Sequence, residues 1–250
     1  MLGRARREAQ TISVERAVPK PSSFRDADAA QAGGYVLLVA GPLVALPLVL
    51  HPLPAGGFAE RASVLATTPI WGVIHAAIAF GCVFVAVGAL LLLVGGGPWR
   101  GWVAAAAWAA VTIGMLFFSV VALINAWVMH DLAASAATDP LAAGLFDAFN
   151  GLLIGFGWLG NPLFLAGLTI VAIIEVRAGT LGLPWWGALG GLVVVGLSWL
   201  RGVGSATGLQ FLEPFILANV PAFLWLSWVG WRIARLADGG APSGRTRTIA

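Results

Sequence analysis

Charged side chains are scarce in this sequence of 250 residues. Lysine and arginine together contribute 14 residues and aspartate and glutamate 11, so the charged fraction is 10%, whereas 59% of the residues are hydrophobic. A soluble domain has about 25% charged residues. Because a water-facing surface could not be built from so few charges, the composition excludes an ordinary soluble domain and predicts an integral membrane protein whose exterior faces lipid.

Several chemically reactive patterns are also missing. The only cysteine, Cys82, lies in an apolar run, which excludes an intrachain disulfide and any CxxC site and predicts a buried small hydrophobe. The only lysine is Lys20, so no glycine-rich phosphate loop ends in lysine. HxxxH, HExxH and GxSxG patterns are absent. We therefore expect a non-enzymatic protein with no cofactor and no metal site.

Six apolar runs predict helices that cross a bilayer, which takes about 20 residues each. They are Tyr35 to Leu50, extended by Gly33 and His51, then Ile70 to Val94, Trp102 to Met129, Leu141 to Val176, Leu183 to Leu200, and Phe211 to Ile233. The fourth run is too long for one straight span, so we expect an interfacial lead-in through Asn150 and a span from about Gly151. Pro52 to Thr68 and His130 to Pro140 are expected to be loops, and Gly95 to Gly101 a tight turn. The predicted fold is an all-α bundle of six transmembrane helices.

Basic residues indicate the orientation of these spans. With the N-terminus inside, 12 basic residues fall in inner segments and 2 in outer segments, which is the bias of the positive-inside rule. The inner ones are Arg4, Arg6, Arg7, Arg16, Lys20, Arg25, Arg100, Arg177, Arg232, Arg235, Arg245 and Arg247, and the outer ones are Arg61 and Arg201. We expect polar cytoplasmic tails at residues 1–32 and 238–250 around a transmembrane domain of residues 33–237.

The three histidines, His51, His75 and His130, all fall in the outer half of this topology. Imidazole suits copper, zinc and haem iron, so an outer-face metal or haem site is the sharpest hypothesis that they allow. Counted from the turn near Pro98, however, His75 lies about 23 residues back and His130 about 32 residues on, so straight helices place them at different heights. We therefore expect no haem and no stoichiometric metal, with His75 hydrogen-bonded between helices instead.

Other polar residues near the same depth are candidates for binding a ligand. Asp147 and Asn150 share a helix face, where they line an outer vestibule or where Asp147 complements the dipole of a nearby helix start. Arg201 and Glu213 flank the outer connection between the fifth and sixth spans, as an ion pair or as a grip for an anion.

Asparagines mark the polar positions inside the spans. Asn161 precedes Pro162 and Asn219 lies two residues before Pro221, so each amide is expected to satisfy carbonyls that a proline frees. Asn125 is the third asparagine inside the spans and has no proline beside it. The alternative is that these side chains line a small polar cavity. The rest of the membrane interior is predicted to be nearly free of ionisable groups.

Glycine pairs allow helices to approach closely. Gly151 and Gly155 form one small-xxx-small pair, and Gly187 and Gly191 form another. Such pairs are common in a chain with 33 glycines, so they do not settle whether the protein forms oligomers.

The second half of the chain, from Phe146 to Arg235, resembles the DUF4386-type family of bacterial membrane proteins. The similar features are a long glycine-rich span, a Leu-Gly-Leu-Pro-Trp-Trp turn from Leu181 to Trp186, and Glu213-Pro214 opening the last helix. A His-Pro pair at His51 and Trp71-xxx-His75 are features of many uncharacterised bacterial membrane proteins. The resemblance implies a six-helix architecture in the inner (plasma) membrane and no particular chemistry.

Three functions are compatible with these patterns. The leading hypothesis is an accessory or structural subunit of a larger membrane assembly, with lipid and other membrane subunits as partners and no nucleic acid. The second is a binder or transporter of a small ligand that enters from the outer face, and the third is an outer-face metal or haem protein that uses the histidines.

Overall fold

The computed structural model describes residues 23–52, 58–99, 101–207 and 209–238, and for a few of these, Glu213 among them, the backbone alone. All regular structure in this part of the chain is helical. The elements are α1 (Ser23–Val49), α2 (Phe58–Thr67), α3 (Trp71–Gly95), α4 (Trp102–Ile124), the π-helix η1 (Asn125–Met129), α5 (His130–Ser135), α6 (Pro140–Ala178), α7 (Trp185–Thr207), the 3₁₀-helix η2 (Gln210–Ala218) and α8 (Asn219–Asp238).

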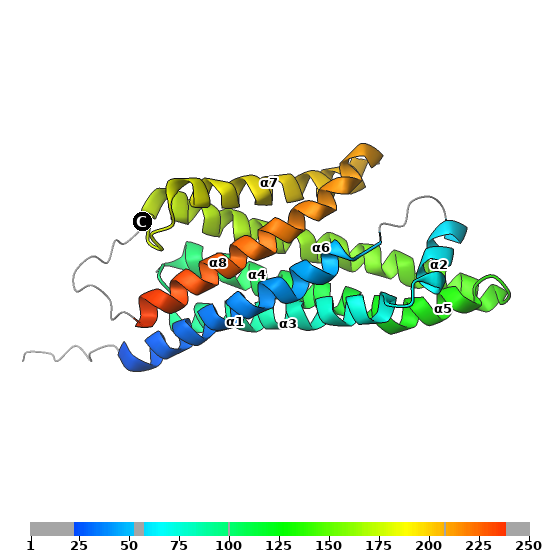
Figure 1. The fold of residues 1–250 in the computed structure, drawn as a ribbon, viewed down its shortest axis with the longest axis horizontal. Helices are drawn as coiled ribbons and strands as arrows, with labels where there is room; N and C mark the ends of the chain where they lie inside the picture. The colour runs from blue at the N-terminus through cyan, green and yellow to red at the C-terminus, as the bar shows by residue number, and fades with distance from the viewer. Residues whose placement is uncertain (1–22, 53–57, 100, 208, 239–250) are drawn as a thin grey trace, which may run out of the picture.

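Six of these helical stretches are long and apolar enough to cross a membrane, which confirms the all-α class and the number of predicted spans. They are Ala27–Val49, Trp71–Gly95, Trp102–Ser135, Pro140–Ala178, Trp185–Gly204 and Phe215–Ala237. Figure 1 shows that α1 begins and α8 ends at the same end of the bundle, which we call the terminal end, while α2 and α5 lie at the opposite end, the distal end.

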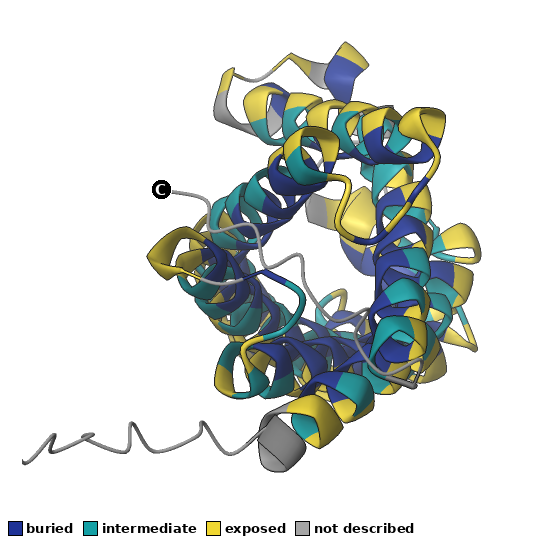
Figure 2. Cartoon of the chain, turned by 90° about the vertical axis from the view of Figure 1, so that its left-hand side faces the viewer, coloured by how far each residue is buried: buried dark blue, intermediate teal, exposed yellow. Residues whose placement is uncertain are grey.

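The six spans form a closed ring. Each packs against its neighbour in the order α1, α3, α4, α6, α7 and α8, and α8 returns to α1. Figure 2, a view along the bundle, shows this ring, with exposed positions turned mainly outward. The main hydrophobic core lies between these helices and includes Leu37, Val85, Met115, Leu168 and Leu226, all fully buried.

Glycine brings the first and last spans into contact. A Cβ atom on Gly34 would lie 2.6 Å from the carbonyl oxygen of Gly230, and a Cβ on Gly230 would lie 2.6 Å from that of Gly34. Ser227 adds a hydrogen bond from its Oγ to the Leu37 carbonyl, 3.3 Å away. The pairing of α1 with α8 closes the ring and places the two helix ends together.

The predicted turn between the second and third spans is confirmed as a helical hairpin. Gly96, Gly97 and Gly101 have φ angles of 74°, 42° and 112°, a region that residues with a Cβ rarely adopt. Arg100, inside this turn, lies outside the described residues.

Both loops expected at the distal end contain helices, so that part of the prediction was wrong. α2 occupies most of Pro52 to Thr68, and α4 continues through η1 into α5 where a loop was expected to begin at His130. The division of the fourth run was also wrong, because α6 is one helix of 39 residues that runs through Asn150 and Pro162. At about 1.5 Å per residue it is nearly twice as long as the hydrocarbon layer is thick.

These extra helical turns form a second, smaller core at the distal end. Its buried members come from α2, α3, η1, α5 and the first half of α6, namely Ala62, Leu65, Trp71, Met129, Ala133, Phe146 and Leu153. Apolar burial against α2 explains why the distal segments are helices and not loops. α1 also begins earlier than the expected first span, at Ser23 and not Gly33.

Candidate functional site

The candidate site is a cluster of two histidines and a tryptophan at the junction between the two cores. His51 follows the end of α1, and Trp71 and His75 lie in the first turns of α3. Because they are four residues apart on one helix, Trp71 and His75 share a face, and their ring centroids are 4.2 Å apart. The His51 ring lies 5.2 Å from that of Trp71 and 4.8 Å from that of His75.

A hydrogen bond joins the two imidazoles. The Nε2 atoms of His51 and His75 are 3.1 Å apart, and Nδ1 of His75 lies 3.0 Å from the Trp71 carbonyl oxygen. A carbonyl only accepts, so Nδ1 of His75 carries a proton and donates it. In a neutral pair, His75 Nε2 is then the acceptor and His51 Nε2–H is the donor. Hydrogen bonds thus assign the tautomer of both rings.

This assignment leaves the Nδ1 atom of His51 with a free lone pair. Nδ1 is buried and has no partner in hydrogen-bond geometry among the residues that the structure describes. Adding one proton to the pair turns the same atom into a donor on an imidazolium. The pair can therefore exchange a proton at His51 Nδ1. It can also present that nitrogen to a small ligand, as an acceptor when the pair is neutral or as a donor when it is protonated.

Burial lowers the pKa of His51, and this is the largest influence on it. The backbone carbonyls of Pro52 and His51 act in the opposite direction and only partly offset it. The folded protein therefore favours neutral His51, which is the state in which Nδ1 is an acceptor.

A π-helix fixes the other side of the cluster. Trp71 donates its indole N–H to the carbonyl of Asn125, the first residue of η1, at 2.9 Å. Asn125 in turn donates from its side-chain Nδ2 to the Val121 carbonyl at 3.0 Å. A π-helix shifts backbone carbonyls out of the regular α-helical pattern, and such segments often occur at functional sites. Here it supplies the acceptor that holds Trp71 beneath both histidines.

The geometry of the pair limits its ligands. Two imidazoles on opposite sides of a haem iron need about 4 Å between their nitrogens, twice a metal–nitrogen bond of ~2 Å, and the observed separation is 3.1 Å. A single metal ion bound side by side to both Nε2 atoms fits that separation, but no group of three or more His, Cys, Asp or Glu side chains in the described part of the chain surrounds such an ion.

The third histidine, His130, has a different partner. His130 begins α5, and its Nδ1 lies 3.6 Å from a carboxylate oxygen of Asp131. Asp147 is exposed and Asn150 is half-buried on α6. The interpretation that Asp147 complements the dipole of a helix start was wrong, because α6 begins at Pro140, seven residues earlier. Asp139 caps that start by accepting a hydrogen bond from Leu141 N at 2.8 Å.

The remaining predicted residues lie on α6, α7 and α8. Asn161 of α6 faces α7, where a Cβ on Gly202 would lie 3.8 Å from its Nδ2 atom. Arg201, next to Gly202, is half-buried, and the side chain of Glu213 lies outside the described residues. Asn219 begins α8, and its buried Oδ1 has no hydrogen-bond partner among the described residues. The amide that does bond a carbonyl is Asn125, which has no proline nearby.

A buried carboxylate at the terminal end corrects the expectation that ionisable groups are nearly absent from the spans. Glu175 of α6 is only 1% exposed. Its oxygens accept hydrogen bonds from Leu181 N at 3.0 and 3.2 Å and from Leu183 N at 3.4 Å. Arg232 of α8 donates to the Leu181 and Gly182 carbonyls of the same turn. A lone carboxylate six residues before a proline-containing turn was the signal in the sequence, and the role is structural.

No family model, curated protein or solved structure matches this chain. The likeness to the DUF4386-type family accordingly stays a prediction.

Proposed function

We propose that this protein is a non-enzymatic subunit, accessory or structural, of a larger membrane assembly. A glycine face on α6 that nothing in the described chain covers carries the proposal. Ideal Cβ atoms on Gly144, Gly151 and Gly155 would meet no atom within 4 Å. Ala148, which lies between them, is exposed. At 100° per residue these four positions fall within a narrow stripe along one side of the helix.

The second small-xxx-small pair shows what a covered face looks like in the same molecule. A Cβ on Gly187 would lie 2.5 Å from the ring of Trp228, and one on Gly191 would overlap the ring of Trp225. Trp225 also donates its indole N–H to the Gly187 carbonyl at 3.0 Å. One glycine pair is thus used inside the chain, and the other is left for contact with a helix from outside it, since small residues let helix backbones approach closely in lipid.

A paired substitution tests this proposal. Gly151→Leu with Gly155→Leu is expected to reduce the size of the complex extracted from native membranes in mild detergent and to release its partner. The thermal stability of the isolated chain should stay the same, because both sites open onto empty space. Gly196→Leu on α7 is the control, since a Cβ there also meets nothing within 4 Å. A wild-type chain that is extracted alone, with the same mass as the double variant, would refute the proposal.

The histidine pair favours a second candidate function, the binding of a small ligand. His51 Nδ1 is the observation that supports it, because a buried nitrogen without a partner is costly unless something completes it. We expect the pure protein to show no Soret band and no stoichiometric copper or zinc. If the protein binds a metal that is lost in His51→Gln but kept in His130→Gln, this expectation is wrong and the histidine pair is a metal site.

We also propose an orientation. The 12-to-2 distribution of basic residues supports placing the terminal end in the cytoplasm of a bacterial inner membrane and the histidine pair toward the outside.

A further inference from the structure

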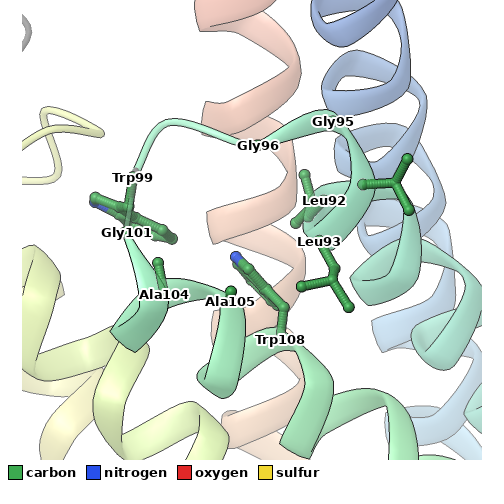
Figure 3. Close-up of a pocket in the computed structure, with 10 residues that line it drawn as sticks. Leu92, Leu93, Gly95, Gly96, Trp99, Gly101, Ala104, Ala105 and Trp108 are labelled. Atoms are coloured by element: carbon green, nitrogen blue, oxygen red, sulfur yellow. The ribbon is translucent and has the colours of Figure 1, made fainter.

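A cavity lies at the terminal end, far from the histidine pair, where the turn between α3 and α4 closes the hairpin (Figure 3). Its volume is about 280 Å³, and it is partly open to the outside. Its walls include Leu92 and Leu93 of α3, Ala104, Ala105 and Trp108 of α4, and Trp99 of the turn. None of these residues takes part in the site described above.

Two indole N–H groups beside this cavity have no acceptor in the part of the chain that the structure describes. The Nε1 atoms of Trp108 and Trp99 are buried without a hydrogen-bond partner, and the two residues are 2% and 5% exposed. Figure 3 shows the Trp108 nitrogen directed toward the space under Gly96. Buried tryptophans usually find a partner for this group, and leaving a buried donor unsatisfied is costly. An acceptor from outside the chain would remove that cost at Trp108.

The local sequence keeps this space open. Gly95, Gly96 and Gly101 contribute no side chains to it, and Ala104 and Ala105 contribute one methyl group each. The rings of Trp99 and Trp108 stack at 23° with centroids 6.1 Å apart, so they support each other and stay beside the opening. The cavity is a consequence of small residues around two fixed indoles.

The chemistry of the lining selects a ligand class. An indole N–H only donates, so it binds an acceptor oxygen and offers nothing to a cation or a second donor. Leucine and alanine walls suit an apolar body attached to that oxygen. Trp102, one turn from the cavity on α4, is 81% exposed, as expected of a residue at the membrane surface. Phospholipids present phosphate and ester oxygens next to hydrocarbon at the membrane interface, which is where tryptophans gather.

We propose that this cavity binds a membrane phospholipid, with Trp108 Nε1–H donating to a phosphate or ester oxygen of the headgroup region. Free phosphate carries the same kind of oxygen but has no apolar body for the leucine wall.

Delipidated protein in detergent tests the proposal with two probes, a short-chain phosphatidylglycerol and inorganic phosphate. We expect the lipid to raise the Tm saturably and to shift one indole ¹H–¹⁵N NMR signal, the one that disappears in Trp108→Phe. Inorganic phosphate should do neither. Trp108→Phe keeps an aromatic ring and loses the N–H, so the apparent Kd for the lipid should rise about threefold to tenfold. Trp102→Phe, on the same helix, should leave the Kd unchanged.

A variant that fills the cavity tests whether the lipid binds there without changing either tryptophan. Ala105→Leu keeps both indoles and occupies the space, so we expect it to abolish the lipid-induced shift in Tm while the lipid-free protein stays folded. Equal lipid affinity in Trp108→Phe and wild type, a lipid response that survives Ala105→Leu, or an equal response to inorganic phosphate would each overturn the proposal. No response to the lipid would overturn it too, and would leave water as the partner of Trp108.

Discussion

His51 Nε2 lies 3.1 Å from His75 Nε2, although the residues are separated by α2 and a turn and belong to different ends of their helices. The contact exists because α1 and α3 are close neighbours in the ring, so the end of one helix meets the start of the other. A hydrogen bond from His75 to its own helix then fixes which ring donates. The pair is thus a polar contact between the end of α1 and the start of α3.

The first prediction concerns pH. Burial holds the pKa of folded His51 below the value of about 6.5 that an exposed histidine has. Between those two pKa values the unfolded chain binds more protons than the folded chain. The contribution of neutral His51 is therefore present above about pH 6.5 and lost as the pH falls. The slope is at most about 1.4 kcal/mol of unfolding free energy per pH unit, because one proton is taken up.

Thermal unfolding in detergent between pH 8 and pH 5 measures this dependence. His51→Gln should flatten the fall in Tm below pH 6.5, whereas His130→Gln removes a different imidazole and should leave the fall as it is. The same curve for wild type and His51→Gln would contradict the assignment of the effect to His51.

The second prediction concerns Glu175. Glu175→Leu removes the acceptor for the N–H groups of Leu181 and Leu183 and should lower the unfolding free energy by about 1–3 kcal/mol, since buried donors would be left without partners. Glu175→Gln keeps one acceptor oxygen and should cost less. Glu175→Leu as stable as Glu175→Gln would show that the turn does not depend on these bonds. Val176→Leu, at an exposed position of the same helix, is the control.

The sequence predicts the class of this fold well because long apolar runs are the strongest signal that a membrane helix has. The prediction from sequence fails where short or polar segments become helical only through contacts with other parts of the chain. Nothing in the composition of Pro52 to Thr68 shows that α2 will pack on α5 and bury Ala62 and Leu65, and without that contact a loop is the natural expectation. The unbroken α6 was missed for a similar reason, because its length exceeds a bilayer crossing and its first half is stabilised by the distal core.

The sequence analysis identified His51 and His75 as candidate residues, but it did not predict that they contact each other. His51 and His75 were both identified as outer residues, but whether they meet depends on the relative height of α1 and α3, which counting along one hairpin does not give. The acceptor for Trp71 was beyond sequence reasoning, because it is a backbone carbonyl that a π-helix displaces. The role of Glu175 was not predicted because its partners are backbone N–H groups, so the only sign of it in the sequence is a lone carboxylate before the turn from Leu181 to Trp186.

The third prediction concerns helix contact. A Cβ on Gly114 of α4 would lie 2.6 Å from the backbone nitrogen of Phe164 and 2.7 Å from the Gly160 carbonyl oxygen, both on α6. Backbone atoms cannot move aside cheaply, so Gly114→Ala should separate the two helices and lower the Tm by several degrees, in line with about 1–3 kcal/mol for overpacking. Gly157→Ala on α6 adds the same methyl group where no atom of the described chain lies within 4 Å, so its Tm should be no lower than that of wild type. Equal losses in the two variants would mean that the close approach of α4 and α6 at Gly114 is not the cause of the loss.

The fourth prediction concerns orientation. Cys82 is the only cysteine and is buried, so a Cys82→Ser chain provides a background for single-cysteine labelling. Thr138, at the distal end beside Asp139, and Thr180, at the terminal end beside Arg177, are both exposed. If the basic residues orient the protein, a membrane-impermeant maleimide will label Thr138→Cys on intact cells and Thr180→Cys only after the cells are opened. The two positions terminate opposite ends of α6, which is one continuous helix, so they must lie on opposite sides if that helix crosses the membrane. Labelling of Thr180→Cys alone on intact cells would reverse the orientation and place the histidine pair on the cytoplasmic side. Labelling of both on intact cells would mean that α6 does not cross, and would remove the six-span topology itself.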